Sequence, residues 1–113
     1  MREIKFRAWD KDKKQMKYNL ECIWCGLSER AGFVYMQYIG LKDKNRREIY
    51  EGDIVKGAGK NPIIYVVEWL DSYGGFAFVD KEKAIPAYEF LVNFCEVIGN
   101  IYENPELLEE GKE

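Results

Sequence analysis

Short segments in which apolar and charged residues alternate, separated by turn residues, limit most strongly how this chain can fold. Residues 4–9 alternate with a period of two, and residues 16–18 do so after a polar stretch at 10–15. This pattern predicts an antiparallel hairpin with one buried face. Residues 63–70 (IIYVVEWL) and 76–79 (FAFV), joined by the turn residues SYGG, predict a second hairpin.

The remaining segments predict further short strands. We expect a strand at 33–39 that ends at Gly40, and others at 48–50, 54–56 and 95–102. Residues 21–30 read as a loop or a short helical turn, and residues 84–94 as a strand or a short helix, since Pro86 opposes a long regular element. Residues 105–110 read as a short helix or a frayed tail, with Asn104 as its cap and Pro105 at its first position.

A chain of 113 residues is one domain by length. We therefore expect a mostly β protein that folds as one unit. An N-terminal antiparallel segment (about 1–50) joins a small SH3-like barrel (about 51–103), because five short strands in about 50 residues fit such a barrel. An acidic tail with a short helical turn follows at 104–113.

Composition excludes several functions. The chain has no histidine, the side chain most used for acid–base catalysis near neutral pH and the commonest metal ligand. The run from Gly57 to Lys60 lacks the Ser/Thr and the helix of a phosphate-binding loop. We therefore expect neither catalysis nor a cofactor. A charged N-terminus and the lack of an apolar run of about 18 residues predict a cytoplasmic protein.

The three cysteines include one motif, Cys22-x-x-Cys25, besides Cys95. A zinc site needs four ligands, so this chain would have to add carboxylates or a second subunit. A redox pair needs a strand–helix setting that the surrounding pattern does not predict. We interpret these cysteines as packing residues or incidental thiols and keep Cys22 and Cys25 as weak candidates for a metal or redox site.

Charge is distributed unevenly along the chain. Residues 1–60 carry 14 Lys/Arg and 9 Asp/Glu, a net of +5, whereas residues 61–113 carry 3 and 11, a net of −8. If folding places the two halves on separate faces, the positive face of one copy complements the negative face of a neighbouring copy. Alternatively, basic turn residues could contact nucleic-acid phosphates, although interspersed acidic residues weaken their field. The candidates for such contacts are Lys11, Lys13, Lys14, Lys44, Arg46 and Arg47.

Four stretches of the chain carry a resemblance to known proteins: IKFRAWDKDKKQM, MQYIGLKDKNRREIYEGDIVK, the VVEW and GGFAFV pair, and EVIGNIYENPELL. Together they resemble one family, the YopX proteins of bacteriophages and prophages of mainly Firmicute bacteria. The resemblance covers residues 2–108 and implies a mostly β fold in the bacterial cytoplasm. The family has no assigned activity, so it supplies no catalytic residues. Its pattern has a glycine where this chain has Arg46, which puts the type of that turn in doubt.

Two motifs within these stretches are interpreted as architectural. Gly52 is expected to supply a backbone angle that other residues disfavour, while Asp53 bonds amides of its turn. Gly99, next to Asn100, is expected to permit a bend or bulge.

The leading hypothesis for the function is a non-catalytic phage accessory protein that binds protein, either a second copy or a phage or host partner. The alternative is nucleic-acid binding by the basic N-terminal half.

Overall fold

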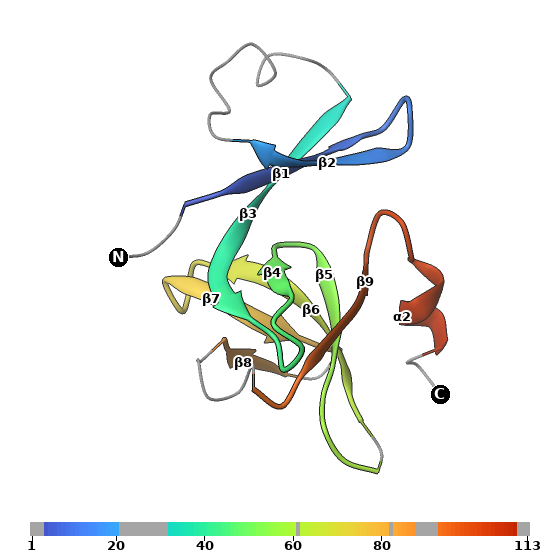
Figure 1. Ribbon diagram of the computed structural model, residues 1–113. Coiled ribbons are helices and arrows are strands. Elements are labelled where there is room, and N and C mark those ends of the chain that lie inside the picture. Colours follow the sequence, from blue (N-terminus) through green and yellow to red (C-terminus); the bar gives the residue numbers. More distant parts are fainter. Residues whose placement is uncertain (1–3, 21–31, 61, 82, 88–92, 111–113) are drawn as a thin grey trace.

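A computed structural model describes residues 4–20, 32–60, 62–81, 83–87 and 93–110. This part of the chain is mostly β, with antiparallel strands in two sheets and a short helical turn near the C-terminus (Figure 1). The strands are β1 (Phe6–Asp10), β2 (Gln15–Leu20), β3 (Phe33–Lys42), β4 (Glu48–Tyr50), β5 (Asp53–Lys56), β6 (Ile64–Leu70), β7 (Gly75–Val79), β8 (Ala84–Pro86) and β9 (Glu96–Asn100), and the helical turn is α2 (Glu106–Glu110).

The first sheet has the order β2-β1-β3-β4, with β1 inside it between β2 and β3. The predicted hairpin of β1 and β2 is confirmed, but the prediction that it buries one face is wrong for β1. Arg7 through Asp10 are all buried, because Arg7 and Trp9 face other parts of the molecule while Ala8 and Asp10 occupy the opposite side of the strand. A strand inside a sheet can be covered on both faces.

The second sheet has the order β8-β7-β6-β5-β9 and curls into a half-barrel (Figure 1). The hairpin predicted between residues 63 and 79 forms β6 and β7, which pair from Val66 with Val79 to Leu70 with Gly75. The stretch that read as either strand or helix contains β8, an edge strand where Pro86 is tolerated. In the described residues β8 and β9 are the two edges and do not pair with each other.

The core of the half-barrel includes residues from both sheets. Ile39 on β3 and Ile49 on β4 pack with side chains of the second sheet, among them Val55, Val67 and Val97. Strand β3 therefore begins in the first sheet and contributes its later residues to the core of the half-barrel. The prediction that it ends at Gly40 is wrong, because Gly40 takes a φ of 91° where the β3–β4 register shifts and the strand continues to Lys42.

Strand β9 carries a bulge beside Gly99. Ile54 pairs with Gly99 but Val55 pairs with Val97, so one extra residue lies on β9. A Cβ on Gly99 would lie 2.5 Å from Asn104 Oδ1, so any other residue there would displace the Asn104 side chain. The same Oδ1 accepts the Asn100 amide at 3.2 Å. The side chain of Asn104 thus fastens the end of β9, while its carbonyl accepts the Leu107 N–H in the first turn of α2, as expected of a residue at the cap position.

The two differently charged halves of the sequence are interleaved in the second sheet. Strand β5, from the basic half, lies between β6 and β9 from the acidic half. The first sheet, by contrast, comes wholly from the basic half. Among the described residues, no helix has the length and apolar character to cross a membrane.

Gly99→Ala tests the crowding at the end of β9. The new methyl group would overlap Asn104, which is held by hydrogen bonds, and we expect the free energy of unfolding in urea to fall by about 1–3 kcal/mol. Gly75→Ala on β7 is the matched control, because its added Cβ would meet nothing within 4 Å. Equal effects of the two substitutions would contradict the proposed crowding.

Candidate functional site

A buried ion pair joins the two sheets. Arg7 on β1 donates from Nη2 to Asp53 Oδ1 at the start of β5, at 2.9 Å, and the two side chains are 2 % and 3 % exposed. The same Nη2 donates to the carbonyl of Glu51 at 3.0 Å. Charges this deeply buried are retained only with partners, so the pair fixes how the first sheet docks on the second.

The turn before β5 presents Asp53 to this pair. Gly52 has a φ of 84°, a left-handed conformation that favours glycine, and its amide and carbonyl hydrogen-bond to Val67 and Ile101. Asp53 Oδ2 accepts the Tyr50 amide at 2.8 Å. Gly52 and Asp53 therefore form the turn that the sequence suggested, and Asp53 has the additional role of holding Arg7.

Aromatic rings enclose the guanidinium of Arg7. Its Cζ lies 4.8 Å from the ring centroid of Tyr50 and 5.9 Å from that of Tyr18, both cation–π contacts. Trp9, next but one to Arg7 on β1, stacks on Tyr102 at 5.8 Å. These contacts exclude water from the junction and strengthen the electrostatic interactions within it.

Burial controls the ionisation of two groups at the junction. Loss of hydration raises the pKa of Asp53 above its ordinary value, and the neighbouring Arg7 guanidinium opposes that rise. Burial and then the nearby Glu48 carboxylate raise the pKa of Tyr50 to about 12. The Tyr50 hydroxyl is therefore a hydrogen-bond donor at neutral pH, and it donates to Glu48 Oε1 at 3.3 Å.

A small polar pocket opens beside this ion pair. Its volume is about 200 Å³. Among the described residues, Arg7 Nε has no hydrogen-bond partner although it is buried. Glu48 is bound on its other oxygen by Lys5 at 2.6 Å. The lining residues are Arg7, Tyr18, Arg47, Glu48, Tyr50 and Asp53.

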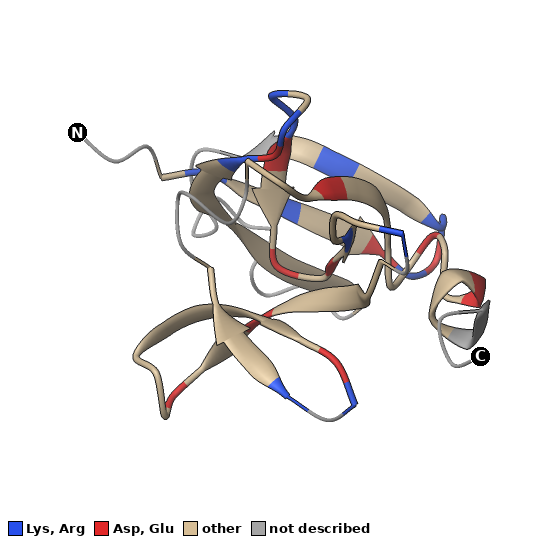
Figure 2. Ribbon diagram, turned by 90° about the horizontal axis from the view of Figure 1, so that it is seen from below, with Lys and Arg blue, Asp and Glu red and all other residues tan. Residues whose placement is uncertain are grey.

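The six basic candidates lie in two separate turns. Lys11, Lys13 and Lys14 are exposed in the turn between β1 and β2, and Lys44, Arg46 and Arg47 are exposed in the turn between β3 and β4. Figure 1 places the first turn at the upper right and the second in the lower half of the molecule beside β9, and in Figure 2 the blue segments lie at several separate places and not in one patch. The structure thus brings each set of three together but not all six.

The acidic residue inside the β3–β4 turn is directed inwards. Asp43 is 4 % exposed and accepts the amides of Asn45 and Arg47 through Oδ1 and that of Val97 through Oδ2. Arg46 adopts a φ of 67°, a left-handed conformation that favours glycine. Asp43 therefore rigidifies the turn from inside, while the basic side chains of the turn remain at the surface.

Gly99 and Asn100 lie outside the polar pocket. Asn100 is buried, and its Oδ1 accepts the amides of Tyr102 and Glu103 while its Nδ2 donates to Glu103. These hydrogen bonds organise the chain after β9. Both residues therefore shape the fold, and neither lines the polar pocket.

The cysteine candidates divide between the described and undescribed parts of the chain. Cys22 and Cys25 lie outside the described residues. Within the described part, no three Cys, Asp or Glu side chains gather as metal ligands would. Cys95 is buried, and burial together with the nearby Asp43 raises the pKa of its thiol to about 11, so the thiol is protonated at neutral pH.

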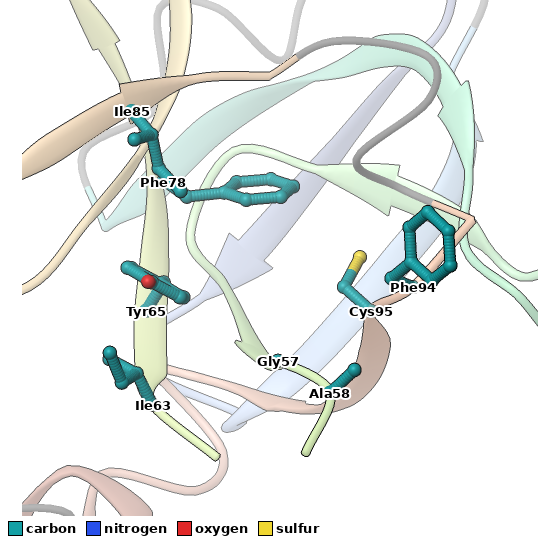
Figure 3. Close-up of a pocket in the computed structure, with 8 residues that line it drawn as sticks. All are labelled: Gly57, Ala58, Ile63, Tyr65, Phe78, Ile85, Phe94 and Cys95. Atoms are coloured by element: carbon teal, nitrogen blue, oxygen red, sulfur yellow. The ribbon is translucent and has the colours of Figure 1, made fainter.

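An apolar pocket of about 230 Å³ lies at one end of the half-barrel. Figure 3 shows Ile63, Tyr65, Phe78 and Ile85 facing Phe94 and Cys95, with Gly57 and Ala58 beneath them. Phe94 is 56 % exposed and Ile63 41 % exposed, whereas Tyr65 and Phe78 are buried. The pocket is therefore an opening in the core with apolar side chains at its rim.

Sequence reasoning missed Arg7, Glu48 and Tyr50 as site residues, and it did not find the apolar pocket. One signal for Arg7 was present. Arg7 and Trp9 are two positions apart and so face the same side of the strand, and a tryptophan in a short strand is seldom exposed, which indicates that this side is covered. The apolar pocket had no such signal, since its walls come from segments between Gly57 and Cys95 that meet only on folding.

Comparison with known proteins assigns the family. A family model described as YopX protein matches residues 20–109. The chain belongs to the YopX family. No curated protein matches it. This YopX protein is similar to the crystal structure of protein EF1440 from Enterococcus faecalis, with a TM-score of 0.74 and 27 % identity over 96 % of this chain and 99 % of that one.

Substitutions at Arg7 and Asp53 test the junction. Arg7→Met or Asp53→Ala leaves the other charge buried without its partner, and we expect each to lower the free energy of unfolding by about 3–5 kcal/mol. The double variant should cost less than the sum of the two, as urea denaturation would measure.

The control is the more exposed pair of Lys5 and Glu48. Lys5→Met should cost only about 0–1 kcal/mol, because solvent screens that interaction. Additive effects of the Arg7 and Asp53 substitutions would show that the two side chains do not depend on each other.

Proposed function

We propose that this YopX-family protein is a non-catalytic module that binds protein, either a second copy of itself or a phage or host protein in the bacterial cytoplasm. The observation that carries the proposal is the apolar pocket, whose rim presents Phe94 and Ile63 to solvent. Exposed apolar side chains around a cavity are typical of surfaces that bind other proteins.

The chemistry of the pocket favours binding over catalysis. Its walls are aliphatic and aromatic, and the thiol of Cys95 beside them is held protonated by burial. A protonated thiol is a poor nucleophile. The volume of about 230 Å³ suits an apolar side chain inserted from a partner.

We also propose that the half-barrel belongs to the SH3-like class. Its support is the run of five short antiparallel strands from Asp53 to Asn100 in the described residues, closed on one side by β3 and β4 through Ile39 and Ile49. Small barrels of this kind commonly bind ligands at their open ends.

Phe94→Asp tests the proposed protein-binding surface. If a second copy is the partner, the mass of the wild-type protein in light scattering should rise above 13.3 kDa with concentration, and the variant should stay monomeric because a carboxylate opposes insertion into an apolar site. Ile4→Asp is the control, since Ile4 is exposed and lies outside the pocket.

A different partner would be found by capture from phage-infected cells. The protein retained by wild type and by Ile4→Asp should then be absent with Phe94→Asp. A strictly monomeric protein from which Phe94→Asp removes no captured partner would contradict the proposed function.

Nucleic-acid binding is a second candidate, favoured by the inward orientation of Asp43. With that carboxylate bound to three amides, the β3–β4 turn presents Lys44, Arg46 and Arg47 as an exposed and rigid cationic tip. A rigid tip loses little conformational entropy when it contacts phosphates.

Replacing Lys44 and Arg46 with Ala tests this candidate. We expect the wild-type protein to retard DNA or RNA in a gel at low salt. The slope of the logarithm of the binding constant against the logarithm of the salt concentration should fall in magnitude by about two in the variant, one for each lost phosphate contact. Lys81→Ala with Lys83→Ala is the matched control, because these lysines are exposed and are not among the candidate contacts. Absence of binding at low salt would eliminate the candidate.

A further inference from the structure

We propose that the polar pocket between Arg7 and Arg47 is a binding site for a carboxylate. This site is distinct from the apolar pocket, and the proposal does not depend on protein binding there. The residues that carry it come from β1, from the β3–β4 hairpin and from the start of β5. They converge on a space of about 200 Å³, which is large enough for a small organic acid or an acidic side chain.

Both carboxylates of the pocket are already engaged. Asp53 binds Arg7 Nη2 and the Tyr50 amide, and Glu48 binds Lys5 and the Tyr50 hydroxyl. Each of the four carboxylate oxygens therefore already accepts one hydrogen bond, whereas Arg7 Nε–H is buried and donates none among the described residues. An added acceptor would meet groups that need one and would displace no existing ion pair.

Two guanidinium groups supply these donors. Arg7 Nε–H is buried and has no hydrogen-bond partner among the described residues, a costly arrangement that an acceptor would relieve. Arg47 is exposed at the pocket, and no ion pair of its side chain is found in the described part of the chain. Arg47 thus gives the accessible contact and Arg7 the buried one.

The charge of the site favours a monoanion. Arg7, Arg47 and Lys5 carry three positive charges against the two negative charges of Asp53 and Glu48, a net of +1. A carboxylate neutralises this charge, whereas a phosphate dianion would leave an excess negative charge beside two carboxylates. Because Nη2 of Arg7 is engaged by Asp53 and the Glu51 carbonyl, Arg7 offers the ligand its unpaired Nε–H, and a planar bidentate contact would be made by the guanidinium of Arg47.

Access to Arg7 requires one side-chain movement. Tyr18 is 46 % exposed, and its ring centroid lies 5.9 Å from Arg7 Cζ. Because Arg7 Nε is buried, a carboxylate held by Arg47 would reach it once a side chain of the lining moves, and the exposed Tyr18 ring is the candidate for that movement.

Nuclear magnetic resonance of the arginine Nε–H groups tests the site directly on the full chain. Titration with sodium acetate should shift the Arg7 Nε–H signal to saturation, whereas sodium chloride at equal ionic strength should not. Arg47→Met should weaken acetate binding by about tenfold or more. Lys44→Met is the matched control, because Lys44 is exposed in the same turn but does not line the pocket.

Two further titrations identify the source of the carboxylate. Binding of an end-blocked glutamate-containing peptide more tightly than acetate would assign the site to an acidic side chain of a partner, and equal or weaker binding would assign it to a free acid. Equal shifts with acetate and chloride, an unchanged affinity in Arg47→Met, or tighter binding of inorganic phosphate than of acetate would overturn the proposal.

Discussion

The buried ion pair of Arg7 and Asp53 is the interaction on which the arrangement of the two sheets depends. Each charge would be costly to bury alone, so Arg7 on the first sheet and Asp53 on the second can be buried only when the two sheets are docked together. Such a pair adds little net stability compared with an apolar substitute, but it strongly penalises a wrong docking. Its main effect is therefore to specify one relative position of β1 and β5.

The aromatic and backbone contacts around the ion pair extend that constraint into the fold. Tyr50 contacts Arg7 through its ring and Asp53 through its amide, so β4 is fixed by the same two residues. The residue next to Tyr50, Ile49, packs in the core of the half-barrel. The β3–β4 hairpin thus links the junction to the half-barrel, whose core includes Ile39 and Ile49 from the first sheet.

Local pattern was sufficient to predict most of the strands, because period-two alternation and turn residues act within a few positions. It failed where the environment is set at long range. Gly40 resembled a strand end but occupies a bulge within β3, and Arg7 resembled a solvent-facing residue but is buried by a residue 46 positions away in the sequence. The apolar pocket could not be predicted for the same reason, since Gly57 and Cys95 approach only through the pairing of β5 with β9.

The charge composition of the β3–β4 turn could be interpreted only once the partners of its acidic side chains were known. In the sequence, Asp43 and Glu48 offset the basic residues of the β3–β4 turn, yet in the structure Asp43 binds three amides and Glu48 binds Lys5. The turn therefore presents cations at its tip, while Arg47 at its base also lines the polar pocket. A substitution at Arg47 should affect both surfaces, whereas one at Lys44 affects the tip alone, and this difference makes it possible to separate binding at the tip from binding in the pocket.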